Sequence, residues 1–237
     1  MKITVLGTGE GGRLHAAKLS ELGHEVVVGT RDPATTLART EPDMMGNPPM
    51  SEWLAAHPGI ALLSFGAAAA AADRLVISGI DGASAVNALS GIKEQLTGKV
   101  LVDYGIPFNY GVSGPHPWPT PWGSMPTFAV LDSDSLGEQI QRALPNTHVV
   151  KAFCTQEQAT VVSPGDFNGG DHTMPISGND PEAKAAVVDL LKSYGWTDIL
   201  DLGPLVSARG QEMYSHLHSA IGFALGGDRR FGLKVVR

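Results

Sequence analysis

The stretch Ile3-Thr4-Val5-Leu6-Gly7-Thr8-Gly9-Glu10-Gly11-Gly12 decides the fold of this chain. Its first four residues form a short apolar run that is typical of a buried strand. Glycines then follow in the spacing G-x-G-x-x-G, and the pattern after them predicts a helix over residues 13–22 that ends at Gly23. A second apolar run at residues 25–28 completes a strand–helix–strand unit.

The same alternation continues along the chain. Further strands are expected at residues 60–65, 75–78, 100–103 and 148–153, with helices at 67–72, 84–96 and 136–144. Residues 33–59 contain five prolines and are expected to be mostly loop, with a short helix at 51–56. Continuously apolar strands separated by helices indicate a parallel sheet covered on both faces. The sequence therefore predicts an α/β protein with a Rossmann-type, doubly wound parallel sheet.

After about residue 155 the order of the elements changes. Strands are expected at residues 174–177 and 199–202, and helices at 181–194 and 209–225. We therefore expect a dinucleotide-binding domain over residues 1–155 and a smaller C-terminal α/β domain over residues 156–237. The second domain is expected to complete the pocket of the first.

Composition excludes several classes of partner. The net charge of −7 argues against binding to nucleic acid or an anionic membrane, because both attract basic surfaces. No run of about 18 apolar residues exists to span a bilayer, and the apolar start is too short for a signal peptide. The single cysteine, Cys154, forms no intrachain disulfide and suits a reducing compartment. We expect a cytoplasmic protein that acts on a small molecule.

The glycine-rich stretch predicts a dinucleotide site. Gly7 permits a tight turn, Gly9 lets the backbone approach a pyrophosphate, and Gly12 lets helix and strand pack closely. Between them lie Thr8, Glu10 and Gly11, where the helix N-terminus offers N–H groups to phosphates. A glycine-rich turn without a ligand is the alternative.

The end of the second strand indicates which dinucleotide binds. Enzymes that use NAD usually carry an acidic residue there, whereas this chain has Thr30 and Arg31. A hydroxyl and a guanidinium suit the extra phosphate of NADP. Asp32 complicates this, because it could hold a ribose hydroxyl instead. We predict NADP.

Further residues are expected to follow strands at the same edge of the sheet. Ligands of such sheets bind in the crevice outside the carboxyl ends of the strands. Residues expected near the ribose and nicotinamide are Ser78, Ile80, Asp81 and Ile106. For any one of them, a plain turn is the alternative.

With these motifs, the chain resembles the NADP oxidoreductases that use the 8-hydroxy-5-deazaflavin coenzyme, factor 420, and related NADP-binding reductases. The resemblance rests on residues 8–11, 23–31, 149–153, 177–180, 201–205 and 207–209. It implies hydride transfer between nicotinamide and a flat acceptor ring, a deazaflavin or a flavin. Residues 8–11 with Thr30 and Arg31 would hold NADP, and the acceptor would lie against Cys154, Leu205 and Ser207.

The chain departs from these relatives at two pocket positions. They often carry Asn-Pro where it has Ile106-Pro107, and Asn or His at the position of Cys154. One alternative is therefore an NADP-binding sensor or regulatory protein without catalysis. Another is a reductase of imino acids with a similar fold, and small carbonyl or imine compounds are further candidate acceptors.

Other motifs carry weaker expectations. Cys154 is expected to be a packed thiol, and a redox-active nucleophile is the alternative. We expect no metal site at His216 and His218, because residues two apart point to different faces of a helix. The proline- and tryptophan-rich segment 111–127 is expected to cover the acceptor, the surface or a subunit contact. The apolar stripe of the last helix, Met213, Leu217, Ile221 and Leu225, is expected to be core or the seam of a homodimer.

Overall fold

One mixed sheet organises the molecule. The computed structural model describes residues 1–43, 45–80, 82–109, 127–130, 132–226 and 230–237. In these residues, eight strands form a sheet in the order β10-β9-β8-β5-β4-β1-β2-β3. The strands are β1 (Lys2–Leu6), β2 (Glu25–Thr30), β3 (Ala61–Ser64), β4 (Leu75–Ser78), β5 (Val100–Asp103), β8 (His148–Lys151), β9 (Thr173–Gly178) and β10 (Asp198–Asp201). Two further strands, β6 (Phe108–Asn109) and β7 (Thr127–Phe128), form a separate antiparallel pair.

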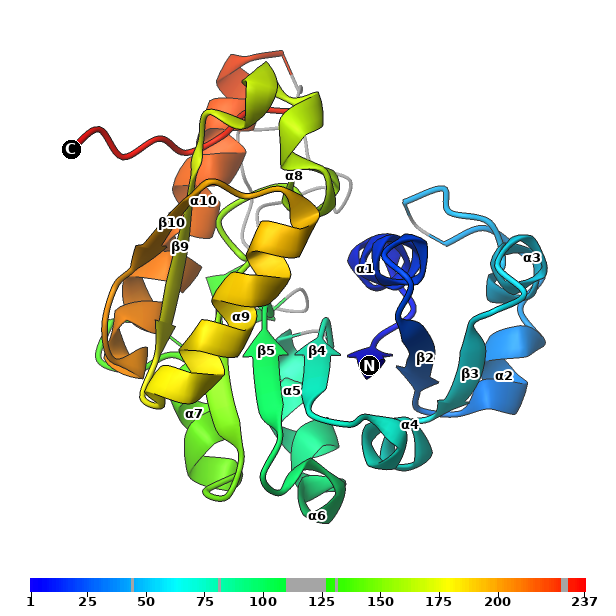
Figure 1. Cartoon of the computed structure of the whole chain (residues 1–237). Coiled ribbons are helices and arrows are strands. Elements are labelled where there is room, and N and C mark those ends of the chain that lie inside the picture. The colour runs from blue at the N-terminus through cyan, green and yellow to red at the C-terminus, as the bar shows by residue number, and fades with distance from the viewer. Residues whose placement is uncertain (44, 81, 110–126, 131, 227–229) are drawn as a thin grey trace.

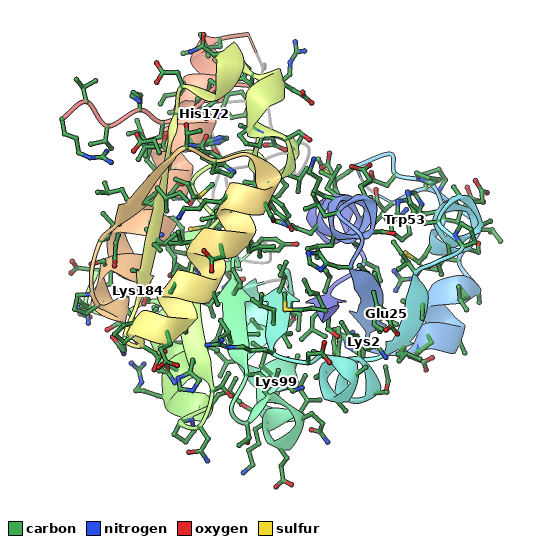
Figure 2. The ribbon with its side chains drawn as sticks, viewed as in Figure 1. Lys2, Glu25, Trp53, Lys99, His172 and Lys184 are labelled. Atoms are coloured by element: carbon green, nitrogen blue, oxygen red, sulfur yellow. The ribbon has the colours of Figure 1, made fainter. Side chains whose placement is uncertain are left out.

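Parallel pairing of six strands confirms the predicted doubly wound fold. The central strand β1 pairs in parallel with β2 and β4, and the pairing continues through β5 to β8 and through β2 to β3. Lys2 lies opposite Glu25 in this register, and their side chains form an ion pair of 2.7 Å at the amino ends of β1 and β2 (Figure 2). The carboxyl ends of all six strands therefore share one edge of the sheet.

Helices cover both faces of this sheet, as Figure 1 shows. One apolar core lies between the sheet and the helices α1 (Glu10–Glu21), α3 (Met50–Ala56), α8 (Gln158–Val162) and α9 (Pro181–Tyr194). The opposite core lies under α4 (Phe65–Ala71), α5 (Gly82–Ser90), α6 (Lys93–Leu96), α7 (Leu136–Ala143) and α10 (Ala208–Ala224). Successive residues of the central strands alternate between the cores: Val100 and Val102 face the first, and Leu101 faces the second.

Two local predictions need correction. The helix expected over residues 84–96 is divided into α5 and α6. The segment 33–59, expected to be mostly loop, begins with the helix α2 (Pro33–Leu37). Asp32 caps that helix by accepting from the N–H of Thr35 (3.1 Å), and Pro33 supplies a preset backbone at its first position. Asp32 followed by Pro33 is therefore a helix start.

The C-terminal segment extends the same sheet. β9 pairs antiparallel with β8, and β10 pairs in parallel with β9. α9 lies against β8 and β9 (Figure 1), and its side chains share a core with those of β1 and β5. The residues after α10 return along β9, where the carbonyl of Leu233 accepts from the N–H of Thr173 (2.6 Å). The boundary between domains at residue 155 stays a prediction.

The last helix exposes most of its apolar stripe. Met213, Leu217 and Leu225 are exposed, so the expectation that they belong to the core is wrong. Met213 and Leu217 lie on the outer side of α10 and Leu225 follows its last residue, while Gln211, Glu212 and Ser215 face inward. The seam of a homodimer stays a prediction. None of the described helices is long and apolar enough to cross a membrane.

Candidate dinucleotide and acceptor site

The glycine-rich loop between β1 and α1 has the geometry that a dinucleotide requires. Gly7 has φ +119°, and a Cβ there would lie 2.9 Å from the carbonyl oxygen of Gly79. A Cβ on Gly12 would collide with the carbonyl oxygen of Gly7, so this glycine lets α1 pack on β1. Gly9, by contrast, has nothing within 4 Å of its Cβ position. The loop is therefore closed on its inner side and open at Gly9, where α1 begins.

Two side chains from other elements support the loop from below. A Cβ on Gly11 would lie 2.9 Å from the Oη of Tyr104 and 3.0 Å from the Cγ of Gln158. A Cβ on Gly79 would overlap the same Tyr104 hydroxyl. Glycine at 11 and 79 therefore makes room for Tyr104, which follows β5.

His15 holds this support in place. It is fully buried on α1, and its Nε2 lies 3.0 Å from the Oε1 of Gln158, while its Nδ1 lies 3.1 Å from the Oη of Tyr194. Its ring stacks on Phe153, with centroids 4.9 Å apart. Burial lowers the pKa of His15 to about 4, so the ring is neutral at pH 7 and bridges a phenol and an amide.

A cavity of about 860 Å³, which we call the loop cavity, opens beside Gly9. Thr8, Gly9 and Glu10 form one wall, and residues 38–43 and 48–50 form another. Arg13 joins the two walls, because its Nε donates to the carbonyl of Thr8 (2.8 Å) and its guanidinium donates to that of Pro48 (2.6 Å). The helix N-terminus, with its unpaired first-turn N–H groups, therefore faces a site of the size of a ligand pocket.

Arg39 lines the loop cavity, whereas Arg31, which follows β2, is not among its lining residues. Arg31 and Arg39 are exposed, and neither makes a hydrogen bond or ion pair with a residue that the structure describes. Arg39 lines the loop cavity and was missed in the sequence because it follows the proline-rich stretch rather than the strand. The Oγ1 of Thr30 lies 2.8 Å from that of Thr36, which also lines the cavity.

A second cavity, of about 290 Å³, lies at the carboxyl ends of β4, β5 and β8; we call it the strand-end cavity. It brings together three predicted residues, Ile80, Ile106 and Cys154. Ser78 lies below it and is fully buried. Asp81 and residues 111–126 lie outside the described residues.

The structure does not bring Leu205 and Ser207 to either cavity. Leu205 is buried in the core beneath α7, and the Ser207 hydroxyl donates to the carbonyl of Leu202 (2.9 Å). Both residues precede α10, which runs from there along the sheet. The third and fourth turns of α10 instead supply three residues that line the strand-end cavity, Ser215, His218 and Ser219.

Comparison with known proteins places the chain in a family. A family model described as "NADP oxidoreductase coenzyme F420-dependent" matches residues 2–107. A solved structure from Arthrobacter sp. FB24, assigned as an F420-dependent NADP-reductase, is 44% identical, with 100% of each chain covered and a TM-score of 0.90. The chain belongs to the coenzyme F420-dependent NADP oxidoreductase family. This membership confirms the predicted fold, and at the level of the family it confirms an NADP-dependent oxidoreductase.

Curated relatives match this family member over part of their length. The F420-dependent NADP reductase of Methanocaldococcus jannaschii is 31% identical over 119 residues, which is 50% of this chain and 48% of that protein. Metalloreductase STEAP3 of Rattus norvegicus is 27% identical over 212 residues, 89% of this chain and 36% of that protein. The chain therefore spans about half or less of these relatives.

A buried cluster of charges lies below the strand-end cavity of this F420-dependent NADP oxidoreductase family member. The Nζ of Lys151 lies 2.8 Å from Oδ2 of Asp103 and 2.9 Å from Oε1 of Glu212, and it also donates to the carbonyl of Gly105. We call Asp103, Lys151 and Glu212 the charge triad. Burial lowers the pKa of Lys151, but the two carboxylates outweigh burial and raise it, so the ammonium stays charged.

Cys154, His216 and His218 are the remaining residues that the sequence singled out in this family member. Cys154 is buried, and burial raises the pKa of its thiol to about 12, so it is no thiolate at pH 7. His216 stacks on Phe128 (4.2 Å between centroids), whereas His218 stacks on Phe231 (4.4 Å). Among the described residues, no three metal-ligating side chains gather.

Proposed function

We propose that this chain catalyses hydride transfer between NADP(H) and a flat acceptor ring of the deazaflavin class, coenzyme F420. One observation carries the proposal. The glycine-rich loop, which is open at Gly9, lies between two cavities. The exposed Arg39 lines the loop cavity, whereas the described lining of the strand-end cavity contains no lysine or arginine. That division matches a dinucleotide, which has phosphates at one end and an uncharged or cationic ring at the other.

The loop cavity fits the phosphates and the adenosine end. The N–H groups of the first turn of α1 and the backbone at Gly9 would take the pyrophosphate. Arg31 and Arg39 would take the 2′-phosphate, because guanidinium groups bind its oxygens in pairs. Neither arginine has to leave a partner within the described structure to do so.

The strand-end cavity fits the reacting rings. Ile80, Ile106 and the protonated thiol of Cys154 give it an uncharged surface, and Ser215 and Ser219 add hydroxyl groups. The cofactors supply the chemistry, a proton and two electrons moving together as a hydride from one ring to the other. The protein holds the two rings in contact and excludes water from between them. Solvent provides the second proton that the acceptor needs.

A turnover assay tests the proposal. The purified chain is mixed with NADPH and, separately, with a deazaflavin, a flavin and a small imine, and the absorbance of the reduced nicotinamide is followed. We expect oxidation with the deazaflavin and much slower oxidation with the imine. Tight binding of NADPH without turnover on any acceptor would instead indicate a sensor.

A binding assay tests the cofactor. One charge-assisted hydrogen bond contributes about 1.5–3 kcal/mol, so Arg31→Ala is expected to weaken NADPH about tenfold or more while NADH changes little. Arg74→Ala, which changes an exposed arginine outside both cavities, is the matched control. Equal losses for both nucleotides would refute the 2′-phosphate role.

The single cysteine leads us to propose further that the chain works in a reducing cytoplasm.

A further inference from the structure

The charge triad carries a net negative charge inside the protein. Glu212 accepts from Lys151, from the N–H of Gly137 (3.0 Å) and from the N–H of Leu136 (2.9 Å). Asp103 accepts from Lys151 and from the N–H of Gly105 (3.0 Å). Burial raises the pKa of Glu212, and Lys151 and the N–H of Leu136 act against that rise. Every one of the partners of Glu212 and Asp103 is a donor, which fits two ionised carboxylates. Two carboxylates and one ammonium leave one negative charge.

This charge lies directly behind the wall of the strand-end cavity. Gly105 lines the cavity, and its N–H and carbonyl are both bound by the triad. Ser215 also lines the cavity, one turn beyond Glu212, and its hydroxyl donates to the Glu212 carbonyl (2.7 Å). The net charge of the triad therefore acts on the cavity from below.

We propose that the charge triad favours the oxidised nicotinamide ring over the reduced ring in the strand-end cavity, and thereby biases hydride transfer away from bound NADPH. The inference rests on the proposed function, which seats nicotinamide there. The oxidised ring carries a positive charge and the reduced ring carries none, whereas the rest of the dinucleotide is the same in both. A buried negative charge therefore acts on one redox state selectively.

The magnitude is large enough to matter. Two unit charges about 10 Å apart, at an effective dielectric constant of about 20, change an equilibrium constant by roughly tenfold. Because the triad is buried, salt screens it much less than a surface charge. The triad contacts no substrate in this scheme and acts through its field.

Binding of the two redox states separates this role from a structural one. Glu212→Gln removes the negative charge at nearly the same size, and Glu212→Asp keeps the charge while it shortens the side chain. The dissociation constants of NADP+ and NADPH are measured by calorimetry for each protein. We expect the ratio of the NADP+ constant to the NADPH constant to rise about fivefold or more in Glu212→Gln and to stay near the wild-type ratio in Glu212→Asp.

The other possible results of these binding measurements test either the role of the charge triad or the proposed function. An unchanged ratio in Glu212→Gln, or equal weakening of both nucleotides, would overturn the inference and leave the triad a structural role. If wild type binds neither nucleotide, the proposed function itself fails. If Glu212→Gln does not fold, Asp103→Asn removes the same charge from the end of β5, and the same rise in the ratio is expected.

Discussion

The buried imidazole of His15 predicts how the stability of this protein depends on pH. Its pKa is about 4 in the folded state, and an unfolded chain gives histidine a pKa of about 6.5. At about 1.4 kcal/mol per pH unit, this difference corresponds to about 3 kcal/mol of unfolding free energy. Because the folded pKa is the lower one, this stability is fully present above pH 6.5 and is lost as the pH falls towards 4.

The assay compares wild type with His15→Gln. Urea unfolding is followed at several pH values between 7 and 4, and the difference in unfolding free energy between the two proteins is plotted. The comparison is needed because burial also lowers the pKa of His172 and His24, and both proteins share those residues. We expect the advantage of wild type to shrink by about 3 kcal/mol over this range. Parallel curves for the two proteins would refute the account of His15 as a neutral bridge.

Three further experiments test the site and its support. Gly12→Ala is expected to destabilise the fold severely, because the added Cβ would collide with the backbone of Gly7. Gly9→Ala is expected to melt near the wild-type temperature and yet to bind NADPH at least about tenfold more weakly. Similar melting temperatures for the two variants would contradict the loop geometry. Lys151→Met is expected to cost about 3–5 kcal/mol in urea unfolding, because it leaves two buried carboxylates without their cation, and a loss below about 1 kcal/mol would argue against the buried charges. Cys154 is expected to react with a thiol reagent far more slowly in the native protein than in urea, because it is buried and protonated; equal rates would show an accessible thiol.

Local sequence rules were sufficient for the parts of the site that are contiguous in the chain. The roles of Gly7, Gly9 and Gly12 follow from their spacing after an apolar strand, and the structure gives each the expected surroundings. The helix at residues 181–194 was predicted with its observed bounds, because Pro181 begins it and Gly195 ends it in the left-handed conformation (φ 104°). In each case the signal lies within one turn of the feature that it predicts.

The rest of the site depends on contacts between distant segments. Asp103, Lys151 and Glu212 are far apart in the chain, so the sequence alone could not show that they meet. One signal was present, because Asp103 and Lys151 each end a strand that is buried on both faces, and a charge there needs a partner. The reversed direction of β9 and the placement of Leu205 and Ser207 away from the cavity also depend on how the C-terminal segment returns to the sheet.

Transfer of an isotope between the two rings tests the central claim most directly. NADPH that carries deuterium at carbon 4 on one face of its ring is incubated with the protein and the deazaflavin, and the reduced acceptor is analysed by mass spectrometry. If the protein holds the two rings in contact, NADPH labelled on one face delivers its deuterium to the acceptor carbon, and NADPH labelled on the other face delivers none. Deuterium lost to water, or equal transfer from both faces, would contradict a site that seats both rings.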